Sequence, residues 1–135
     1  MSSTRNPSLF LSIGLLVLTP AVWAEVICGK ERPLKPVRCV CGRLIDPSAG
    51  PVSGALVTLN QNGIPFGTVS TDADGKFRFR ELKPGSYELA ADFDGFRPFR
   101  SRVVVTKPVN TCRREWVIVM ELPYPPNCGS YVMKQ

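Results

Sequence analysis

Hydrophobic and polar residues alternate along most of this chain, in short runs separated by Gly, Pro, Asn and Asp. Alternation with a period of two predicts half-buried strands, and regularly spaced turns between such runs are typical of a β-sandwich. No stretch after Ala24 has the periodicity of a capped helix. We therefore predict an all-β, seven-stranded Greek-key sandwich, with strands over residues 37–45, 55–60, 65–70, 76–80, 86–92, 98–106 and 114–122.

The parity of each strand predicts which side chains form the core. The expected inward-facing residues are Val40, Leu44, Ala55, Val57, Leu59, Phe77, Phe79, Tyr87, Leu89, Phe99, Ser101, Val103, Val105, Trp116, Ile118 and Met120. The dipeptide Asn62-Gly63 is a strong signal for a tight hairpin. Gly42, inside the first strand, predicts a close approach by another backbone or a large side chain.

The amino-terminal segment has the features of a secretory signal peptide. Arg5 precedes a ten-residue apolar run over 9–18, and Val22-Trp23-Ala24 carries small residues at the positions that a signal peptidase recognises. We expect cleavage after Ala24, with a retained amino-terminal anchor as the alternative. The predicted organisation is a signal peptide over 1–24, a polar leader over 25–36, the sandwich over 37–122 and a Pro-rich tail over 123–135.

Charge and composition narrow the classes of function. The 135 residues carry a formal net charge of +6 and contain no histidine. Histidine is the commonest general base and metal ligand, so its absence excludes His-dependent triads and most zinc sites. We expect no catalytic residue, no cofactor and no metal, and hence a protein that is not an enzyme.

Five cysteines follow the predicted cleavage site: Cys28, Cys39, Cys41, Cys112 and Cys128. An exported chain is expected to form disulfides. Five choices of the unpaired cysteine and three pairings of the other four leave fifteen two-bridge arrangements open. A zinc–thiolate site is disfavoured, because one residue separates Cys39 from Cys41 and zinc ligand pairs are usually two to four residues apart. The odd cysteine leaves open a disulfide-linked dimer.

Several segments, taken in order, resemble a known family. They are Cys41-Gly-Arg-Leu-Ile-Asp46, Gly50-Pro-Val-Ser-Gly-Ala-Leu-Val-Thr-Leu59, Thr71-Asp-Ala-Asp-Gly-Lys-Phe-Arg-Phe79, Leu82-Lys-Pro-Gly-Ser-Tyr-Glu-Leu89 and Gly95-Phe96. This series is similar to the carboxypeptidase regulatory-like domain, a transthyretin-like Greek-key sandwich. The resemblance implies a non-catalytic accessory domain with a carbohydrate-binding-like fold. It also implies parallel first and last strands, and therefore a bridge from Cys112 to Cys39 or Cys41, with Cys28 and Cys128 tying down the flanking segments.

Three clusters are candidates for binding. Five basic residues could form one outward face for an anionic polymer: Lys76, Arg78, Arg80, Arg100 and Arg102. Asp72 and Asp74 begin like a calcium loop, but the twelfth position is Lys83 where a bidentate Glu is needed, so we predict a turn. Tyr87, Phe99 and Trp116 could stack on a sugar, although their inward parity favours the core.

The functional expectation is an exported accessory or adhesion-type binding module, secreted or periplasmic. Its expected partner is a protein or a surface polymer such as a glycan, and peripheral contact with a cell surface is left open. Nucleic acid is not expected as a partner outside the cell. The alternatives are a carbohydrate-binding protein and, less favoured, a thiol-redox protein.

Overall fold

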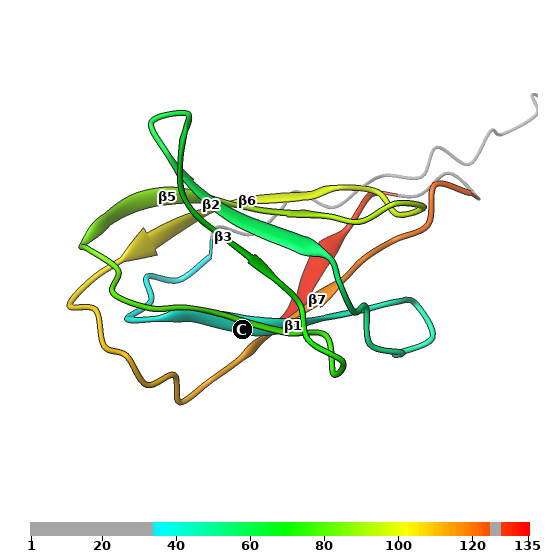
Figure 1. Ribbon diagram of the computed structural model, residues 1–135, viewed down its shortest axis with the longest axis horizontal. Helices are drawn as coiled ribbons and strands as arrows, with labels where there is room; N and C mark the ends of the chain where they lie inside the picture. The colour runs from blue at the N-terminus through cyan, green and yellow to red at the C-terminus, as the bar shows by residue number, and fades with distance from the viewer. Residues whose placement is uncertain (1–33, 125–127) are drawn as a thin grey trace, which may run out of the picture.

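The computed structural model describes residues 34–124 and 128–135, and these residues contain eight strands in two four-stranded sheets (Figure 1). The predicted signal peptide and most of the polar leader lie outside the described residues. The strands are β1 (Val40–Ile45), β2 (Leu56–Gln61), β3 (Ile64–Ser70), β4 (Lys76–Phe79), β5 (Gly85–Asp92), β6 (Phe99–Val105), β7 (Trp116–Val119) and β8 (Tyr131–Lys134). The all-β sandwich is confirmed, and the predicted strand count of seven is wrong by one.

The two sheets have the strand orders β4-β1-β7-β8 and β3-β2-β5-β6. We call them the cysteine sheet and the hairpin sheet, after Cys41 in β1 and the β2–β3 hairpin. Strands β1 and β7 run parallel, as the family resemblance implied, with Gly42 opposite Trp116 and Ile45 opposite Val119. Every other pairing of strands is antiparallel. In the described part of the chain, no helix is long and apolar enough to cross a membrane.

The core lies between the two sheets and contains every predicted inward-facing residue except Ser101, together with Val52, Leu82 and Ala91, which were not predicted. In β2, Val57 and Leu59 are fully buried while Leu56 is 53% exposed. The aromatic residues Tyr87, Phe99 and Trp116 are all at most 3% exposed, so they belong to the core, as expected, and form no sugar-stacking platform. Removal of such side chains from water is the main favourable term for folding.

The cysteine sheet is also covered on part of its outer face. All four residues of β7 are buried, and a second small cluster consists of Ile45, Val117 and Val119. The register pairs Ile45 with Val119, whereas Leu44 and Ile118 point into the main core. The close approach predicted at Gly42 is present, because a Cβ atom there would lie 2.6 Å from the carbonyl oxygen of Trp116.

The turns follow the residues that favour them. Asn62 and Gly63 have φ values of 53° and 76°, the left-handed conformation that a two-residue hairpin requires. In the next turn, Asp72 Oδ1 accepts hydrogen bonds from the backbone N–H groups of Asp74 and Lys76, both at 2.9 Å. The Asp72 carboxylate therefore holds a turn, as predicted.

The unpredicted strand is β8, in the segment expected to be a Pro-rich tail. It pairs antiparallel with β7 and places Val132 against the core. Ser130, just before it, accepts a hydrogen bond from the Glu121 backbone at 2.9 Å. Its four residues were too few to show a clear alternation, yet pairing of β8 protects the edge of β7 that would otherwise be open.

Candidate functional site

The parallel pairing of β1 with β7 brings distant cysteines together at one end of the sandwich. Cys39, just before β1, forms a disulfide with Cys112, in the connection that leads to β7, with their Cα atoms 5.6 Å apart. The bridge joins residues separated by 73 positions in the sequence. A bridge from Cys112 to Cys39 or Cys41 was expected, and the structure selects Cys39.

The other cysteines differ in state. Cys41 is a free, buried thiol, and its sulfur lies 3.6 Å from the carbonyl oxygen of Arg114. Burial raises the pKa of the Cys41 thiol; Arg78 opposes this effect and Glu115 adds to it. Cys128 is disulfide-bonded, and Cys28 lies outside the described residues. Because disulfides persist mainly outside the reducing cytoplasm, the Cys39–Cys112 bridge agrees with export.

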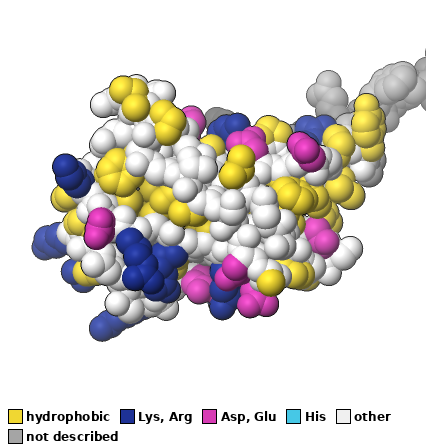
Figure 2. Space-filling view, viewed as in Figure 1, with side chains coloured by type: hydrophobic (Ala, Val, Ile, Leu, Met, Phe, Trp, Pro, Cys, Tyr) yellow, Lys and Arg dark blue, Asp and Glu magenta, His cyan; other side chains and the backbone are white. Residues whose placement is uncertain are grey.

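Positive charge gathers at the same end of the sandwich. Figure 2 shows Lys and Arg side chains in dark blue at the left of the molecule, where Figure 1 places the end of β6 and the connection that follows it. Arg38 is exposed beside Cys39, and Arg113 and Arg114 are exposed after Cys112. The disulfide therefore joins two basic segments that are far apart in the sequence.

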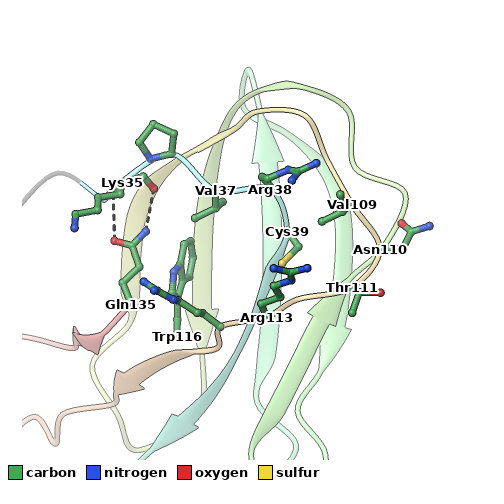
Figure 3. A pocket seen from close by; sticks show the side chains of 12 residues that line it. Lys35, Val37, Arg38, Cys39, Val109, Asn110, Thr111, Arg113, Trp116 and Gln135 are labelled. Carbon is green, nitrogen blue, oxygen red and sulfur yellow. Dashed lines mark hydrogen bonds between the residues drawn. The ribbon is translucent and has the colours of Figure 1, made fainter.

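These segments surround a pocket of about 720 Å³ (Figure 3). The lining has a basic part, a polar part and an apolar part. It consists of Lys35, Pro36, Val37, Arg38, Cys39, Val109, Asn110, Thr111, Arg113, Arg114, Trp116 and Gln135. Four of these residues are Lys or Arg and none is Asp or Glu, so the lining side chains can attract an anion. We call this hollow the basic pocket.

Backbone and amide contacts fix the walls of the basic pocket. Gln135 donates from Nε2 to the Lys35 carbonyl at 2.9 Å and accepts from the Lys35 N–H at 3.2 Å, as the dashed lines in Figure 3 show. On the other wall, Arg38 Nε donates to the Lys107 carbonyl at 3.0 Å, and Val109 N donates to the Arg38 carbonyl at 2.8 Å. Trp116 is 3% exposed, so it supplies an apolar edge to the pocket while its ring stays in the core.

The basic face predicted from the sequence is divided by the fold. Lys76 and Arg78 point outward from β4 in the cysteine sheet, whereas Arg100 and Arg102 point outward from β6 in the hairpin sheet. Because the two sheets pack inner face to inner face, these pairs point in opposite directions, so they do not share one face. Arg80 is exposed just beyond β4.

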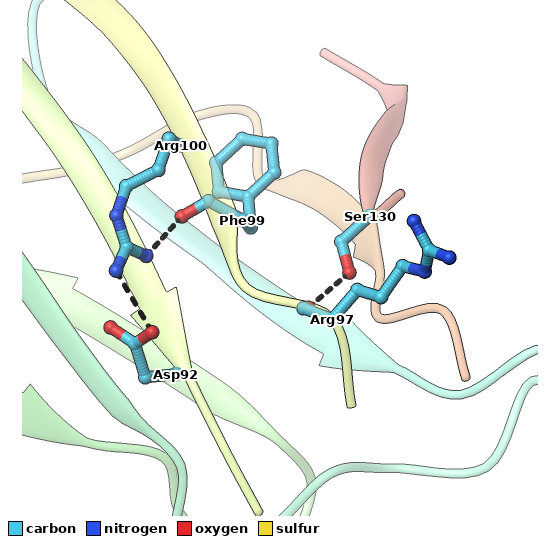
Figure 4. A network of polar contacts seen from close by, with 5 residues as sticks. All are labelled: Asp92, Arg97, Phe99, Arg100 and Ser130. Atoms are coloured by element: carbon cyan, nitrogen blue, oxygen red, sulfur yellow. Dashed lines mark hydrogen bonds and ion pairs between the residues drawn. The ribbon is translucent and has the colours of Figure 1, made fainter. Parts of the chain in front are cut away.

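The guanidinium group of Arg100 is also engaged in contacts with neighbouring residues. Its guanidinium lies 2.9 Å from the Asp92 carboxylate and donates to the Phe99 carbonyl at 2.7 Å (Figure 4). The same view shows Ser130 donating to the Arg97 carbonyl at 2.6 Å, which ties β8 to the segment before β6. Arg100 therefore serves a local contact on the hairpin sheet.

The residues of the basic pocket were missed as a group by reasoning from the sequence. Their one signal was adjacency to cysteine, since Arg38 precedes Cys39 and Arg113 follows Cys112. Once the Cys39–Cys112 bridge is drawn, these two arginines must lie at the same end of the molecule.

A solved structure of Klebsiella pneumoniae 5-hydroxyisourate hydrolase is similar to this chain, with a TM-score of 0.55 and 18% sequence identity. The match covers 72% of this chain and 98% of the hydrolase chain. It corrects the expectation that the protein is not an enzyme, because a protein with this fold is a hydrolase. At this identity the likeness shows a shared fold and assigns no reaction to the present chain.

Curated proteins match over a shorter stretch. The serine-aspartate repeat-containing protein D of Staphylococcus aureus strains Newman and MW2 is 49% identical over 39 residues, which is 28% of this chain. The matched stretch is 3% of the length of those relatives. A family model for the carboxypeptidase regulatory-like domain matches residues 40–113, from the start of β1 to just past Cys112. With more than half of its residues matched, the chain belongs to the carboxypeptidase regulatory-like domain family.

Proposed function

We propose that this protein is an exported binding module that holds an acidic surface polymer, such as an acidic glycan, in its basic pocket. The observation that carries the proposal is the lining of the pocket, which includes Lys35, Arg38, Arg113 and Arg114 and no carboxylate side chain. The family match and the disulfide support an exported module. The choice of an acidic polymer as its partner rests on the lining of the pocket.

The chemistry of the lining favours carboxylate or sulfate groups. An arginine guanidinium can donate two parallel hydrogen bonds to such a group, which gives geometry as well as charge. Arg113 and Arg114 are both exposed and able to do so. Val109, which is 37% exposed, offers an apolar surface beside them, which suits the face of a sugar ring.

The sequence of the amino terminus and the disulfide together support an exported location. We propose that the segment over 1–24 directs the chain to the periplasm or the exterior and is cleaved near Ala24. Protein sequencing of the mature form tests this directly: a first residue of Glu25 supports it, and a retained Met1 contradicts it.

Calorimetric titration with a polyuronate, a sulfated polysaccharide and uncharged dextran tests the proposed ligand class. We expect binding to at least one of the two acidic polymers, weakening as salt is raised, and no binding to dextran. Salt screens interactions between exposed charges over about 8–10 Å, so the salt dependence is part of the expected result.

A pair of double variants locates the site. Arg113→Gln with Arg114→Gln should weaken binding about tenfold, since each lost contact between exposed charges is worth up to about 1 kcal/mol. Lys76→Gln with Arg102→Gln removes the same charge from strands outside the pocket and should leave the affinity within about twofold of the original. Equal losses in the two variants, or no binding to either acidic polymer, would overturn the proposal.

A further inference from the structure

The sulfur atoms of Cys39, Cys41 and Cys112 all lie within 4.8 Å of one another. Two of them form the disulfide and the third is a thiol. Cys39 and Cys41 are two residues apart on the same face of the β1 segment, so either could face Cys112. The cluster therefore contains one disulfide, and Cys112 has two possible partners in it, Cys39 and Cys41.

We propose that this cluster is a disulfide-exchange site, in which the bridge passes from Cys39–Cys112 to Cys41–Cys112. The proposal is independent of any ligand in the basic pocket. The Cys41 thiolate attacks the Cys112 sulfur, the Cys41–Cys112 bond forms and the Cys39–Cys112 bond breaks. Cys39 leaves as a thiolate and takes up the proton that Cys41 released. One disulfide and one thiol are present before and after, so no external oxidant or reductant is needed.

Geometry favours attack on Cys112 over attack on Cys39. Residues two apart in an extended strand are separated by about 6.6 Å, near the upper limit for Cα atoms joined by a disulfide. Cys112 belongs to a separate segment, and Cys41 already contacts the carbonyl of Arg114, two residues after Cys112. A direct Cys39–Cys41 bridge is therefore the less favourable product.

The surroundings of the leaving sulfur also favour exchange. Cys39 is half-buried and lines the basic pocket together with Arg38 and Arg113. Nearby positive charge stabilises a thiolate, and a more stable thiolate leaves faster. Exchange thus moves the thiol from a buried position to the wall of the pocket, where a reagent or a partner's disulfide can reach it.

Burial of Cys41 makes the exchange dependent on pH. The charged groups around Cys41 are Arg78 of β4, Glu115 before β7 and Arg43 on the same outward face of β1. Burial outweighs the attraction of Arg78 and raises the pKa of the thiol. The attacking thiolate is then scarce at neutral pH, and its fraction rises about tenfold for each pH unit below that pKa.

Thiol mapping of the oxidised, mature protein tests the proposal. Samples held at pH 7 to 10 are quenched in acid, unfolded, alkylated and digested with trypsin. Cys39 and Cys41 share the peptide 39–43 and Cys112 lies in 103–113, so fragmentation of the peptides shows which sulfur carries the label. We expect the label on Cys41 at neutral pH and a growing share on Cys39 as the pH rises. Label confined to Cys41 at every pH and time overturns the proposal.

Two variants make the test independent of rates. Cys39→Ser should fold with a Cys41–Cys112 bridge, and Cys41→Ser, the matched control, should keep Cys39–Cys112. A folded Cys39→Ser protein with both Cys41 and Cys112 titratable contradicts the proposal. If Cys39→Ser does not fold, the mapping of the unaltered protein decides.

Discussion

The two sheets of this sandwich differ in how much of their outer faces is buried. In the hairpin sheet, β6 alternates between buried and exposed residues, so one face packs on the core and the other faces water. In the cysteine sheet, every residue of β7 is buried, and Ile45, Val117 and Val119 form a second cluster on the outer face. The cysteine sheet also holds the parallel pair β1–β7 and the disulfide at its end.

The difference shows where each sheet can tolerate change. A parallel pair needs a long connection between its strands, and closing that connection costs chain entropy. The disulfide offsets this cost by restricting the unfolded chain. We therefore expect the cysteine sheet to be sensitive at its bridge, its close backbone contacts and its outer face, and the hairpin sheet to be sensitive only on its inner face.

The largest expected effect comes from the bridge. Cys112→Ser removes the partner that Cys39 and Cys41 share, and should lower the free energy of unfolding by about 4 kcal/mol, given a closed loop of 73 residues. Denaturant unfolding with unchanged slope measures it. Cys39→Ser should cost much less, because Cys41 can replace Cys39 as the partner of Cys112. Equal costs for the two variants would show that the two positions are not interchangeable.

The next largest loss of stability is expected where the backbones of β1 and β7 are in close contact. A Cβ at Gly42 in β1 would lie 2.6 Å from the Trp116 carbonyl oxygen, so Gly42→Ala should destabilise by about 1–3 kcal/mol. Gly67 in β3 is the matched control, because its Cβ would lie 3.7 Å from the ring of Phe79, an ordinary contact. Gly67→Ala should be neutral or slightly stabilising in thermal unfolding. A larger loss at Gly67 than at Gly42 would reverse the ranking of the two sheets.

The sequence predicted the hairpin sheet better than the cysteine sheet. Where one face meets water, as in β2, alternation marks Val57 and Leu59 as buried without knowledge of the neighbouring strands. Burial on both faces of β7 depends on which strands lie beside it, including β8, whose four residues carry little pattern of their own. The choice between Cys39 and Cys41 was open for a related reason: both have the same parity, so spacing cannot distinguish them.

The basic pocket could not be predicted from the sequence pattern because its position depends on the topology of the strands. Charged residues at alternate positions in one strand share a face, but the direction of that face depends on the sheet to which the strand belongs. Lys76 and Arg102 therefore point apart, while Arg38 and Arg113 line one pocket because of a disulfide that the pattern of residues did not select. Strand order and bridge pairing are the two facts that sequence periodicity does not contain.

A smaller effect tests the covered outer face of the cysteine sheet. Val117 is 6% exposed, whereas Val104 on the outer face of the hairpin sheet is 37% exposed. Val117→Thr buries a hydroxyl and should cost about 1–2 kcal/mol, while Val104→Thr should stay within about 0.5 kcal/mol of the original. Chemical denaturation of the two variants compares them. Similar values would mean that the outer cluster contributes no more than an ordinary surface.

The smallest effect is the pH dependence that Cys41 gives to the stability of the cysteine sheet. Burial raises the pKa of this thiol in the folded protein above its value in the unfolded chain, so the unfolded chain loses the proton first. The folded state then binds more protons than the unfolded state, and stability must fall as the pH rises. The stabilisation that the buried thiol contributes is fully present below the pKa of the thiol in the unfolded chain. It is lost as the pH rises through the pKa of the thiol in the folded protein.

Lysines and tyrosines also titrate at high pH, so the measurement is the difference between the original protein and Cys41→Ala, by denaturant unfolding from pH 7 to 10.5. The gap between their unfolding free energies should narrow with pH, and a gap that stays constant would show that the thiol is solvated as well in the fold as outside it.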